Sequence, residues 1–266
     1  MLSIVDWFGY DLPTAERFRL IREAGFDAVM LLWSDEFEGA EFRSQPEWAR
    51  AAGLEVENVH APFRGCNALW TDGVEGDMWL SELVGCVEDC GAFGIGTMVL
   101  HLTEGKAPPL PNDMGAARVW QLAEVAEQCG VNVALENVQV TSPHLEYVLK
   151  RVDSPRIGFC YDSGHDRCYG AGMDLMEAFG ARLMALHLHD NDGTKDSHWL
   201  PFDGVVDWAD VMKRVSAAGY TGAVALESYA HVGGMMASAQ VFLAAAYERG
   251  IQLEKMRRGC DGGSTK

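Results

Sequence analysis

Basic residues are scarce in this chain of 266 residues, in which 21 Lys and Arg stand against 39 Asp and Glu for a formal net charge of −18. Proteins bind nucleic acid largely by placing Lys and Arg against phosphates, so this balance argues against a nucleic acid as the partner. The segment WSDEFEGAEF, which follows the second apolar run, is acidic as well. We therefore expect no nucleic-acid partner.

Targeting segments and nucleotide-binding motifs are also missing. The N-terminus, MLSIVDWFGYDLP, has neither the basic start nor the apolar core of a signal peptide, and no run approaches the length of a membrane span. The chain has 7 cysteines, an odd number in a protein too long to depend on disulfides, which favours reduced thiols. These features predict a cytoplasmic protein without a membrane partner. Because G-x-x-x-x-G-K-[ST], G-x-G-x-x-G and G-x-S-x-G are absent, nucleotide-loop and serine-hydrolase functions have no support.

One pattern repeats along the chain: an amphipathic helix, then a glycine, then an apolar strand. Examples are REAG-FDAVMLL, EQCG-VNVALE and SAAG-YTGAVALE. Glycine readily adopts the left-handed conformation that ends a helix, so each repeat indicates a helix-to-strand turn. The pattern predicts eight strands alternating with helices that begin near Pro13, Ser44, Gly76, Asn112, Ser142, Met173, Asp207 and Met236.

Eight such units predict an α/β fold, a (β/α)8 TIM barrel in a single domain over residues 1–256, with a flexible C-terminal tail over residues 257–266. A doubly wound sheet is the rival, but it requires no eighth strand. Side-chain size favours the barrel. Positions in phase with the polar strand ends are small, such as Ala134, Cys160 and Ala185, while the opposite phase is bulky, as at Leu135 and Phe159. The narrow interior of a barrel accommodates the small residues.

Nine side chains of the metal-ligating type lie at or just beyond the ends of these strands: His60, His101, Glu136, Asp162, His165, His187, Asp196, His198 and Glu227. An ion requires several N and O donors that converge from different elements, and one rim of a barrel brings successive strand ends together. The pattern therefore predicts a metal site and an enzyme.

Within this set, Glu136, Asp162, His187 and Glu227 come from the last four strands. Three carboxylates and one imidazole form a mostly oxygen site suited to Mn, Mg, Co or Zn. His187 and His189 point to the same face of their strand, so either is a candidate ligand. An outer set is expected to bind further metal or to orient the substrate: His60, His101, His165, His189, Asp196 and His198. Trp7 and Phe63, among other aromatic residues after strands, are candidates for the floor of a pocket, although ordinary packing is the simpler interpretation of each.

The segments ENVHAPF, LEN, YDSGH, HLHDNDG, KDSHWLPFDGVVDW and LES together resemble the xylose-isomerase-like TIM-barrel superfamily over nearly the whole chain. This superfamily contains sugar-phosphate isomerases and epimerases, ketose 3-epimerases, inosose-type dehydratases and endonuclease IV. In its isomerases and epimerases, the resemblance implies one divalent metal on Glu136, Asp162, His187 (or His189) and Glu227, with the two glutamates moving protons on opposite faces of the substrate. In endonuclease IV, residues that match all nine donors hold three zinc ions.

Two positions depart from these relatives. Ketose 3-epimerases have an arginine six residues beyond the histidine of strand 7, where this chain has Gly193 or, in the other register, Lys195. Endonuclease IV requires basic loops that face DNA, whereas the loop after strand 2 is acidic here. Simple ketose epimerisation and DNA cleavage are each less favoured as a result.

The sequence thus predicts a metal-dependent isomerase or epimerase of a small sugar, sugar phosphate or polyol-derived ketone, acting by proton transfer through a metal-stabilised enediolate. Glu136 and Glu227 are the expected acid/base pair, and His165 is expected to hold a substrate oxygen. The alternatives are a metal-dependent dehydratase or lyase acting on a keto-inositol or similar substrate, a trinuclear-metal phosphoesterase related to endonuclease IV, and a non-catalytic sugar- or metal-binding barrel. The partner is a small carbohydrate, and a homo-oligomer is compatible with the sequence.

Overall fold

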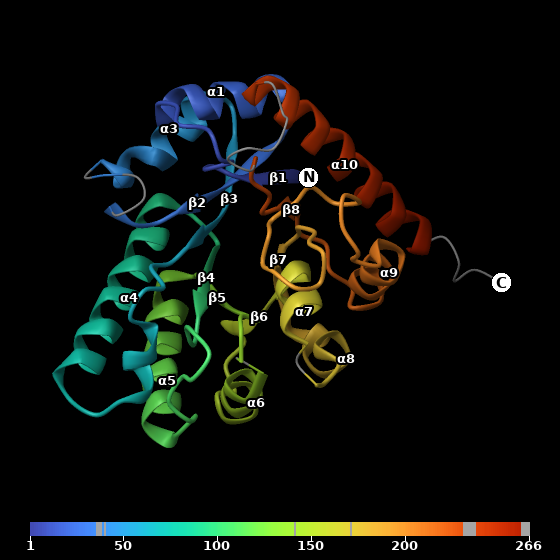
Figure 1. Ribbon diagram of the computed structural model, residues 1–266. Helices are drawn as coiled ribbons and strands as arrows, with labels where there is room; N and C mark the ends of the chain where they lie inside the picture. The colour runs from blue at the N-terminus through green and yellow to red at the C-terminus, as the bar shows by residue number, and fades with distance from the viewer. Residues whose placement is uncertain (36–38, 40, 141, 171, 231–237, 262–266) are drawn as a thin grey trace.

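The computed structural model describes residues 1–261 apart from residues 36–38, 40, 141, 171 and 231–237. Its centre is one sheet of eight parallel strands in the order β7-β6-β5-β4-β3-β2-β1-β8. A parallel bridge between Leu188 and Leu226 brings the two outer strands of that order together, so the sheet curls into the predicted (β/α)8 barrel (Figure 1). The strands are β1 (Leu2–Val5), β2 (Ala28–Leu32), β3 (Glu55–His60), β4 (Thr97–His101), β5 (Asn132–Glu136), β6 (Ile157–Asp162), β7 (Leu183–His187) and β8 (Val224–Leu226).

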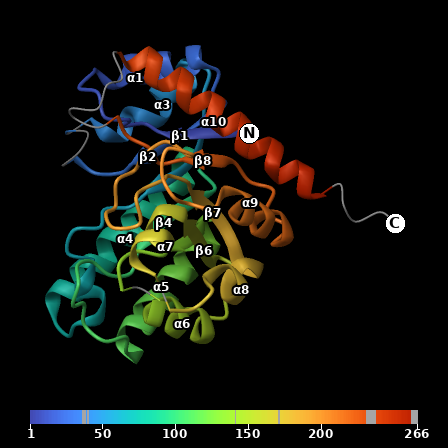
Figure 2. The ribbon, with the colours of Figure 1, turned by 45° about the vertical axis from the view of Figure 1, so that its right-hand side comes forward.

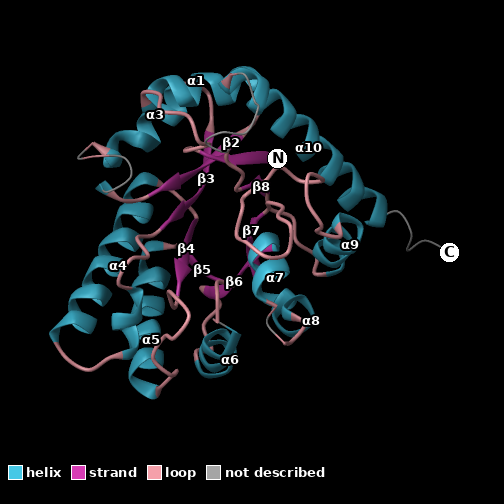
Figure 3. Ribbon diagram, viewed as in Figure 1, coloured by secondary structure: helices cyan, strands magenta, loops and turns pink. Residues whose placement is uncertain are grey.

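Helices surround the strands as an outer layer, as Figures 2 and 3 show. The α-helices are α1 (Thr14–Ala24), α3 (Gln45–Ala51), α4 (Val74–Phe93), α5 (Asp113–Cys129), α6 (Ser142–Arg151), α7 (Ser163–Tyr169), α8 (Leu175–Phe179), α9 (Trp208–Ala217) and α10 (Ala239–Asp261). Three 3-10 helices accompany them: η1 (Phe42–Ser44), η2 (Cys66–Trp70) and η3 (Gly180–Arg182). Seven predicted helix starts lie within two residues of an observed start, whereas the eighth, at Met236, lies outside the described residues. The short helix α7 was not expected.

Helix α10 runs past residue 256, where the sequence predicted the end of the barrel domain. The helix continues to Asp261, beyond the expected start of a flexible tail at residue 257. Arg257 is buried and donates hydrogen bonds from Nη1 to the backbone oxygens of Tyr220 at 3.3 Å and Gly222 at 2.9 Å. These bonds tie the last turns of α10 to the segment before β8, so the barrel domain extends past residue 256.

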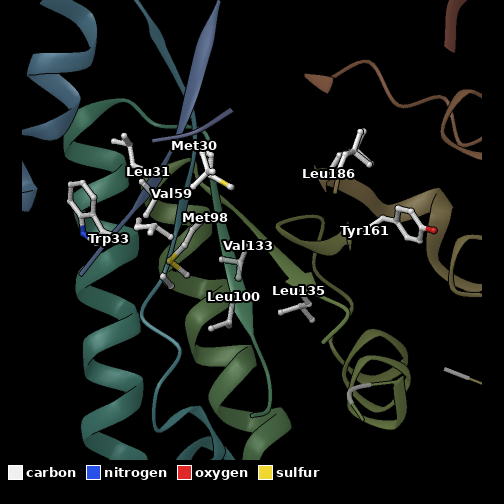
Figure 4. Packing of buried hydrophobic residues seen from close by; sticks show 14 of the residues in the cluster. Met30, Leu31, Trp33, Val59, Met98, Leu100, Val133, Leu135, Tyr161 and Leu186 are labelled. Carbon is white, nitrogen blue, oxygen red and sulfur yellow. The ribbon is translucent and has the colours of Figure 1, made fainter. Parts of the chain in front are cut away.

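The core has two parts, as the alternation of side-chain size predicts. Inside the barrel, Val99, Ala134, Cys160 and Ala185 form a small cluster of their own. The bulky residues of the opposite phase belong to the larger cluster between strands and helices, among them Leu135, Tyr161 and Leu186 (Figure 4). Space inside is tight at Gly158, where a Cβ atom would lie 2.4 Å from Sδ of Met184. The interior is therefore filled below the rim that carries the polar residues.

Cys66, Cys86, Cys90, Cys129, Cys160 and Cys168 are free thiols. Within the described part of the chain, none of the helices combines the length and the apolar character that a membrane span requires.

Candidate active site

The strand ends bring the metal-type side chains to one rim. His60, His101, Glu136, Asp162 and His187 are the last residues of β3, β4, β5, β6 and β7, and Glu227 directly follows β8. The parallel register pairs His101 with Glu136 and Asp162 with His187. Because parallel strands of a barrel end on the same side, these groups meet at its carboxyl-terminal mouth.

A tetrad of Glu136, Asp162, His187 and Glu227 occupies the centre of this rim. Nδ1 of His187 lies 3.0 Å from Oε2 of Glu136 and 3.2 Å from Oε2 of Glu227. Each of the four residues offers one ligand atom, and these atoms all lie within 4.8 Å of one another. The four residues are buried, with at most 5% of any of them exposed.

These donors suit a divalent cation. Both carboxylate oxygens of Glu136, both ring nitrogens of His187 and Oε2 of Glu227 are buried and lack a hydrogen bond of good geometry to the described residues. Buried polar atoms without partners are costly, and a cation held between them would remove that cost. Three carboxylates and an imidazole match the ligand preferences of Mn, Mg, Co and Zn.

The electrostatics of the tetrad also favour a positive charge at its centre. Burial disfavours the charged form of Glu136, but the charges of His187 and His101 outweigh burial and hold its pKa well below the usual range. Burial likewise opposes ionisation of Glu227, yet His187 lowers the pKa of that carboxyl. For His187, burial opposes the imidazolium, while Cys160, Glu136 and Glu227 raise its pKa well above the usual value.

His60 and His101 flank the tetrad on one side. Their Nε2 atoms lie 3.1 Å apart, and Nε2 of His101 is 3.3 Å from Oε2 of Glu136. Nδ1 of His60 lies 2.8 Å from the backbone oxygen of Ala61, which directs Nε2 of His60 toward Glu136 at 3.5 Å. The ligand atoms of His60, His101 and Glu136 form a second compact group.

A third group consists of His165, His189, Asp196 and His198. Asp196 contacts both His165, at 3.1 Å from Nε2, and His198, at 3.3 Å from Nε2. Burial opposes the charged form of His198, but the bond to Asp196 and the charge of Glu227 raise its pKa to about 9. His198 has a φ of 46°, an unusual value for a residue with a side chain, and its Nδ1 lies 2.7 Å from the backbone oxygen of Glu227.

The structure separates His187 from His189, which the sequence left as alternatives. His187 lies in the tetrad, whereas Nε2 of His189 lies 3.0 Å from Oδ1 of Asp162 and belongs to the third group. Gly164 creates the space for this imidazole, because a Cβ atom at that position would lie 1.9 Å from Cε1 of His189. All predicted site residues therefore lie together at the rim, in three adjoining groups.

Asp190 is a buried residue of this region that sequence reasoning did not single out. It accepts hydrogen bonds from Nε1 of Trp208 at 2.9 Å and from the backbone nitrogens of Phe202 and Val206 at 3.0 Å each. Its backbone also pairs with that of Trp199 in both directions. These bonds fix the loop that carries Asp196 and His198. The sequence HDND offered several carboxylates and no signal to choose among them.

A cavity of about 390 Å³ opens above the tetrad. Its polar wall contains Glu136, Glu227 and residues of both flanking groups, and its apolar wall contains Trp7, Leu32, Phe63 and Tyr229. Tyr229 stacks on His198 with ring centroids 4.3 Å apart. Trp7 and Phe63, which the sequence offered as candidates, thus line the pocket. Leu32 also lines it and was not predicted from the sequence.

Comparison with known proteins agrees with this geometry. The family described as xylose isomerase-like TIM barrel matches residues 18–252. The chain is 28% identical over 233 residues to the uncharacterized protein MJ1311 of Methanocaldococcus jannaschii. This alignment covers 78% of this chain and 76% of the relative. It is also 28% identical over 120 residues to a fructoselysine 3-epimerase of Escherichia coli O157:H7, covering 42% of this chain and 44% of that one.

Among solved structures, that of L-ribulose 3-epimerase superposes with a TM-score of 0.79 and covers 100% of this chain and 98% of that one. The two sequences are 18% identical, so the similarity concerns the fold.

Proposed function

The chain belongs to the xylose isomerase-like TIM barrel family, and we propose that it is a divalent-metal-dependent isomerase or epimerase of a small sugar or sugar-like ketone. The observation that carries the proposal is the position of Glu136 and Glu227. Both place Oε2 within 3.2 Å of the same His187 nitrogen at the floor of one cavity. The similarity to a fructoselysine 3-epimerase and to the fold of L-ribulose 3-epimerase supports the same class of reaction.

Glu136, Asp162, His187 and Glu227 would hold the metal. A divalent ion there would polarise the carbonyl and adjacent hydroxyl of a ketose and so lower the barrier to removal of a carbon-bound proton. Glu136 and Glu227 are the groups that transfer this proton, one on each side of the substrate carbon. Their lowered pKa values keep both carboxylates ionised at neutral pH and able to accept it.

His165 is the residue proposed to bind a substrate oxygen. Its Nδ1 lies 3.1 Å from Oε1 of Glu136, so an oxygen bound to this imidazole would lie beside the proposed base. Opposite these polar groups, Trp7, Leu32 and Phe63 exclude water from the substrate carbon. Exclusion of water strengthens the electrostatic interactions on which proton transfer depends.

A trinuclear-metal phosphoesterase is the second candidate, and one observation favours it. The groups His60–His101–Glu136 and His165–His189–Asp196–His198 adjoin the tetrad and offer donors for further metal ions. Among the residues that the structure describes, no Lys or Arg lines the cavity to bind a phosphodiester, which is why we place the isomerase first.

The number of bound metal ions distinguishes the two candidates. Elemental analysis of protein purified without chelators is expected to give one Mn, Mg, Co or Zn per chain. The double variant His60→Ala/His101→Ala should keep that number if the tetrad alone holds the ion. Three ions per chain, reduced by the double variant, would instead support the phosphoesterase.

A further inference from the structure

A second cavity of about 440 Å³ lies beside the one above the tetrad. Its walls come from the segment after β5, which includes Asn137, Gln139 and Ser142, and from α7, which includes His165, Asp166 and Tyr169. His165 lines both cavities. The four proposed metal ligands, Glu136, Asp162, His187 and Glu227, are not among the residues that line the second one. The proposed reaction leaves this second space without a role.

His165 stands at the junction of the two spaces. Its Nδ1 lies 3.1 Å from Oε1 of Glu136, and its ring packs on that of Tyr169 with centroids 5.6 Å apart and planes inclined by 28°. A substrate that is held by His165 and reacts at Glu136 therefore has one end next to the second cavity. Any substituent on that end would extend between the segment after β5 and α7.

The volumes indicate that one sugar does not occupy both cavities. Pockets for small ligands span about 300–1,000 Å³, so the cavity above the tetrad is by itself large enough for a monosaccharide. The second cavity is of similar size. A free monosaccharide bound at the tetrad would leave it to solvent.

The walls of the second cavity select against an anion. They present the amide of Gln139, the hydroxyls of Ser142 and Tyr169, and the carboxylate of Asp166. No Lys or Arg is among the described residues that line the cavity. Thr141 and Ala171, neighbours of these residues in the chain that lie outside the described part, add no basic group either. Tyr161 donates a hydrogen bond to Oδ2 of Asp166 at 2.9 Å, which holds that carboxylate in place. A neutral hydroxylated group or an amine matches these walls, whereas a phosphate does not.

We propose that the second cavity is a subsite for a substituent of the substrate, and that the substrate is a ketose that carries a neutral polar or amine-bearing group on the end next to His165. This inference rests on the proposed isomerase or epimerase function and adds its substrate class. Free ketoses and ketose phosphates are then the poorer ligands.

Titration calorimetry on the Mn-loaded protein tests the subsite. Each D-ketohexose is compared with its derivatives that carry an aminoalkyl group, a glucosyl group or a phosphate at C1 or at C6. We expect an aminoalkyl or glucosyl derivative at one of the two ends to bind about tenfold or more tightly than the free ketose, and the phosphates to gain nothing. The preferred substituent shows whether the subsite receives an amine or a sugar.

Substitutions in the walls of the second cavity test whether the tighter binding of substituted ketoses arises there. Cys168→Trp, on the α7 wall, should fill the second cavity and abolish the advantage of the substituted ketose while leaving the affinity for the free ketose unchanged. Gln139→Ala makes a smaller change to the opposite wall and should reduce the same advantage, which keeps the test valid if the tryptophan disturbs folding. Met114→Trp, at a position 37% exposed on α5, is the matched control and should change neither affinity.

Three outcomes overturn the subsite: no substituted ketose binds more tightly than the free one, a phosphate derivative binds best, or Cys168→Trp weakens free and substituted ketoses alike. Deuterium exchange from solvent into the same compounds separates this inference from the proposed function. Tighter binding of substituted ketoses with neither exchange nor conversion to an isomer or epimer would refute the isomerase and keep the subsite. Exchange with free ketoses that substituents do not improve would refute the subsite and keep the isomerase.

Discussion

Nδ1 of His187 lies 3.0 Å from Oε2 of Glu136, although the two residues end strands that are not neighbours in the barrel. Strand β6 runs between them and contributes Asp162, and Glu227 approaches the same nitrogen from beyond β8. Four buried donors therefore converge on one point from four consecutive strands. The predictions below follow from a single cation at that point and from proton transfer beside it.

Asp162 is the proposed ligand whose loss is easiest to interpret, because it is not part of the proposed acid/base pair. Its Oδ1 also accepts the backbone N–H of His165 at 2.7 Å and caps helix α7, a role that asparagine can keep. We expect Asp162→Asn to weaken Mn binding by about tenfold or more, as measured by titration of the chelator-treated protein. Asp192→Asn, at an exposed site on the loop after β7, is the control and should bind Mn as the wild type does. Unchanged Mn affinity in Asp162→Asn would remove this residue from the site.

Glu57 should make stability depend on pH in a direction unusual for a carboxylate. Burial raises its pKa from 4.5 to about 7, against the opposing effects of the His187 charge and the Asn58 amide. A carboxyl group with a pKa raised in the folded state binds its proton more tightly there than in the unfolded chain. Its contribution to stability therefore falls as the pH rises from 4.5 through about 7.

Glu57→Gln, which stays neutral, should then have little effect on the free energy of unfolding at about pH 4.5 and should raise it by about 1–2 kcal/mol at about pH 8. Urea unfolding of the metal-free protein at both values measures the difference. Glu55→Gln, on the exposed part of the same strand, is the control and should show no such trend. A Glu57→Gln effect that is equal at both pH values would contradict the raised pKa.

We expect the protein not to bind duplex DNA. This holds although the three groups at the rim contain all nine donors that match the zinc ligands of endonuclease IV. The net charge of −18 repels phosphates at long range, and Arg43, beside the acidic loop after β2, is already paired with Asp89 at 2.9 Å. A gel-shift and an abasic-site cleavage assay at low salt are expected to be negative. Metal-dependent incision of abasic DNA at low protein concentration would place the phosphoesterase ahead of the isomerase.

The sequence was sufficient for the strands because each one is a short apolar run, and β3 to β7 also end in a polar residue. From β2 onward, most of these runs follow a helix that closes with a turn. Local signals of this kind also placed the helix starts. The short helix α7 was missed, although Asp162 followed three residues later by His165 is a capping arrangement that could have marked it. The continuation of α10 to Asp261 had no local signal, because the contacts of Arg257 with the segment before β8 join residues far apart in the chain.

The assignment of His187 and His189 to different groups could not be predicted, since both have the same parity on one strand. What separates them is tertiary: β7 ends at His187, Leu188 then bridges to Leu226, and Gly164 leaves room for the displaced imidazole of His189. The second cavity was equally inaccessible to sequence reasoning, because its walls come from the segment after β5 and from the unexpected helix α7.

Solvent exchange in the glutamate variants tests the central claim most directly. The Mn-loaded protein is incubated in heavy water with ketoses and their substituted derivatives, and deuterium at carbon is followed by NMR and mass spectrometry. Glu227→Gln and Glu136→Gln are compared at Mn concentrations that fill the site of each variant, with Glu23→Gln on the exposed face of α1 as the control. The account predicts metal-dependent incorporation at one carbon of the true substrate by the wild type and the control, and a loss of several orders of magnitude in both active-site variants, because an amide cannot accept the proton. Turnover of that substrate at the wild-type rate by both metal-filled variants would contradict it.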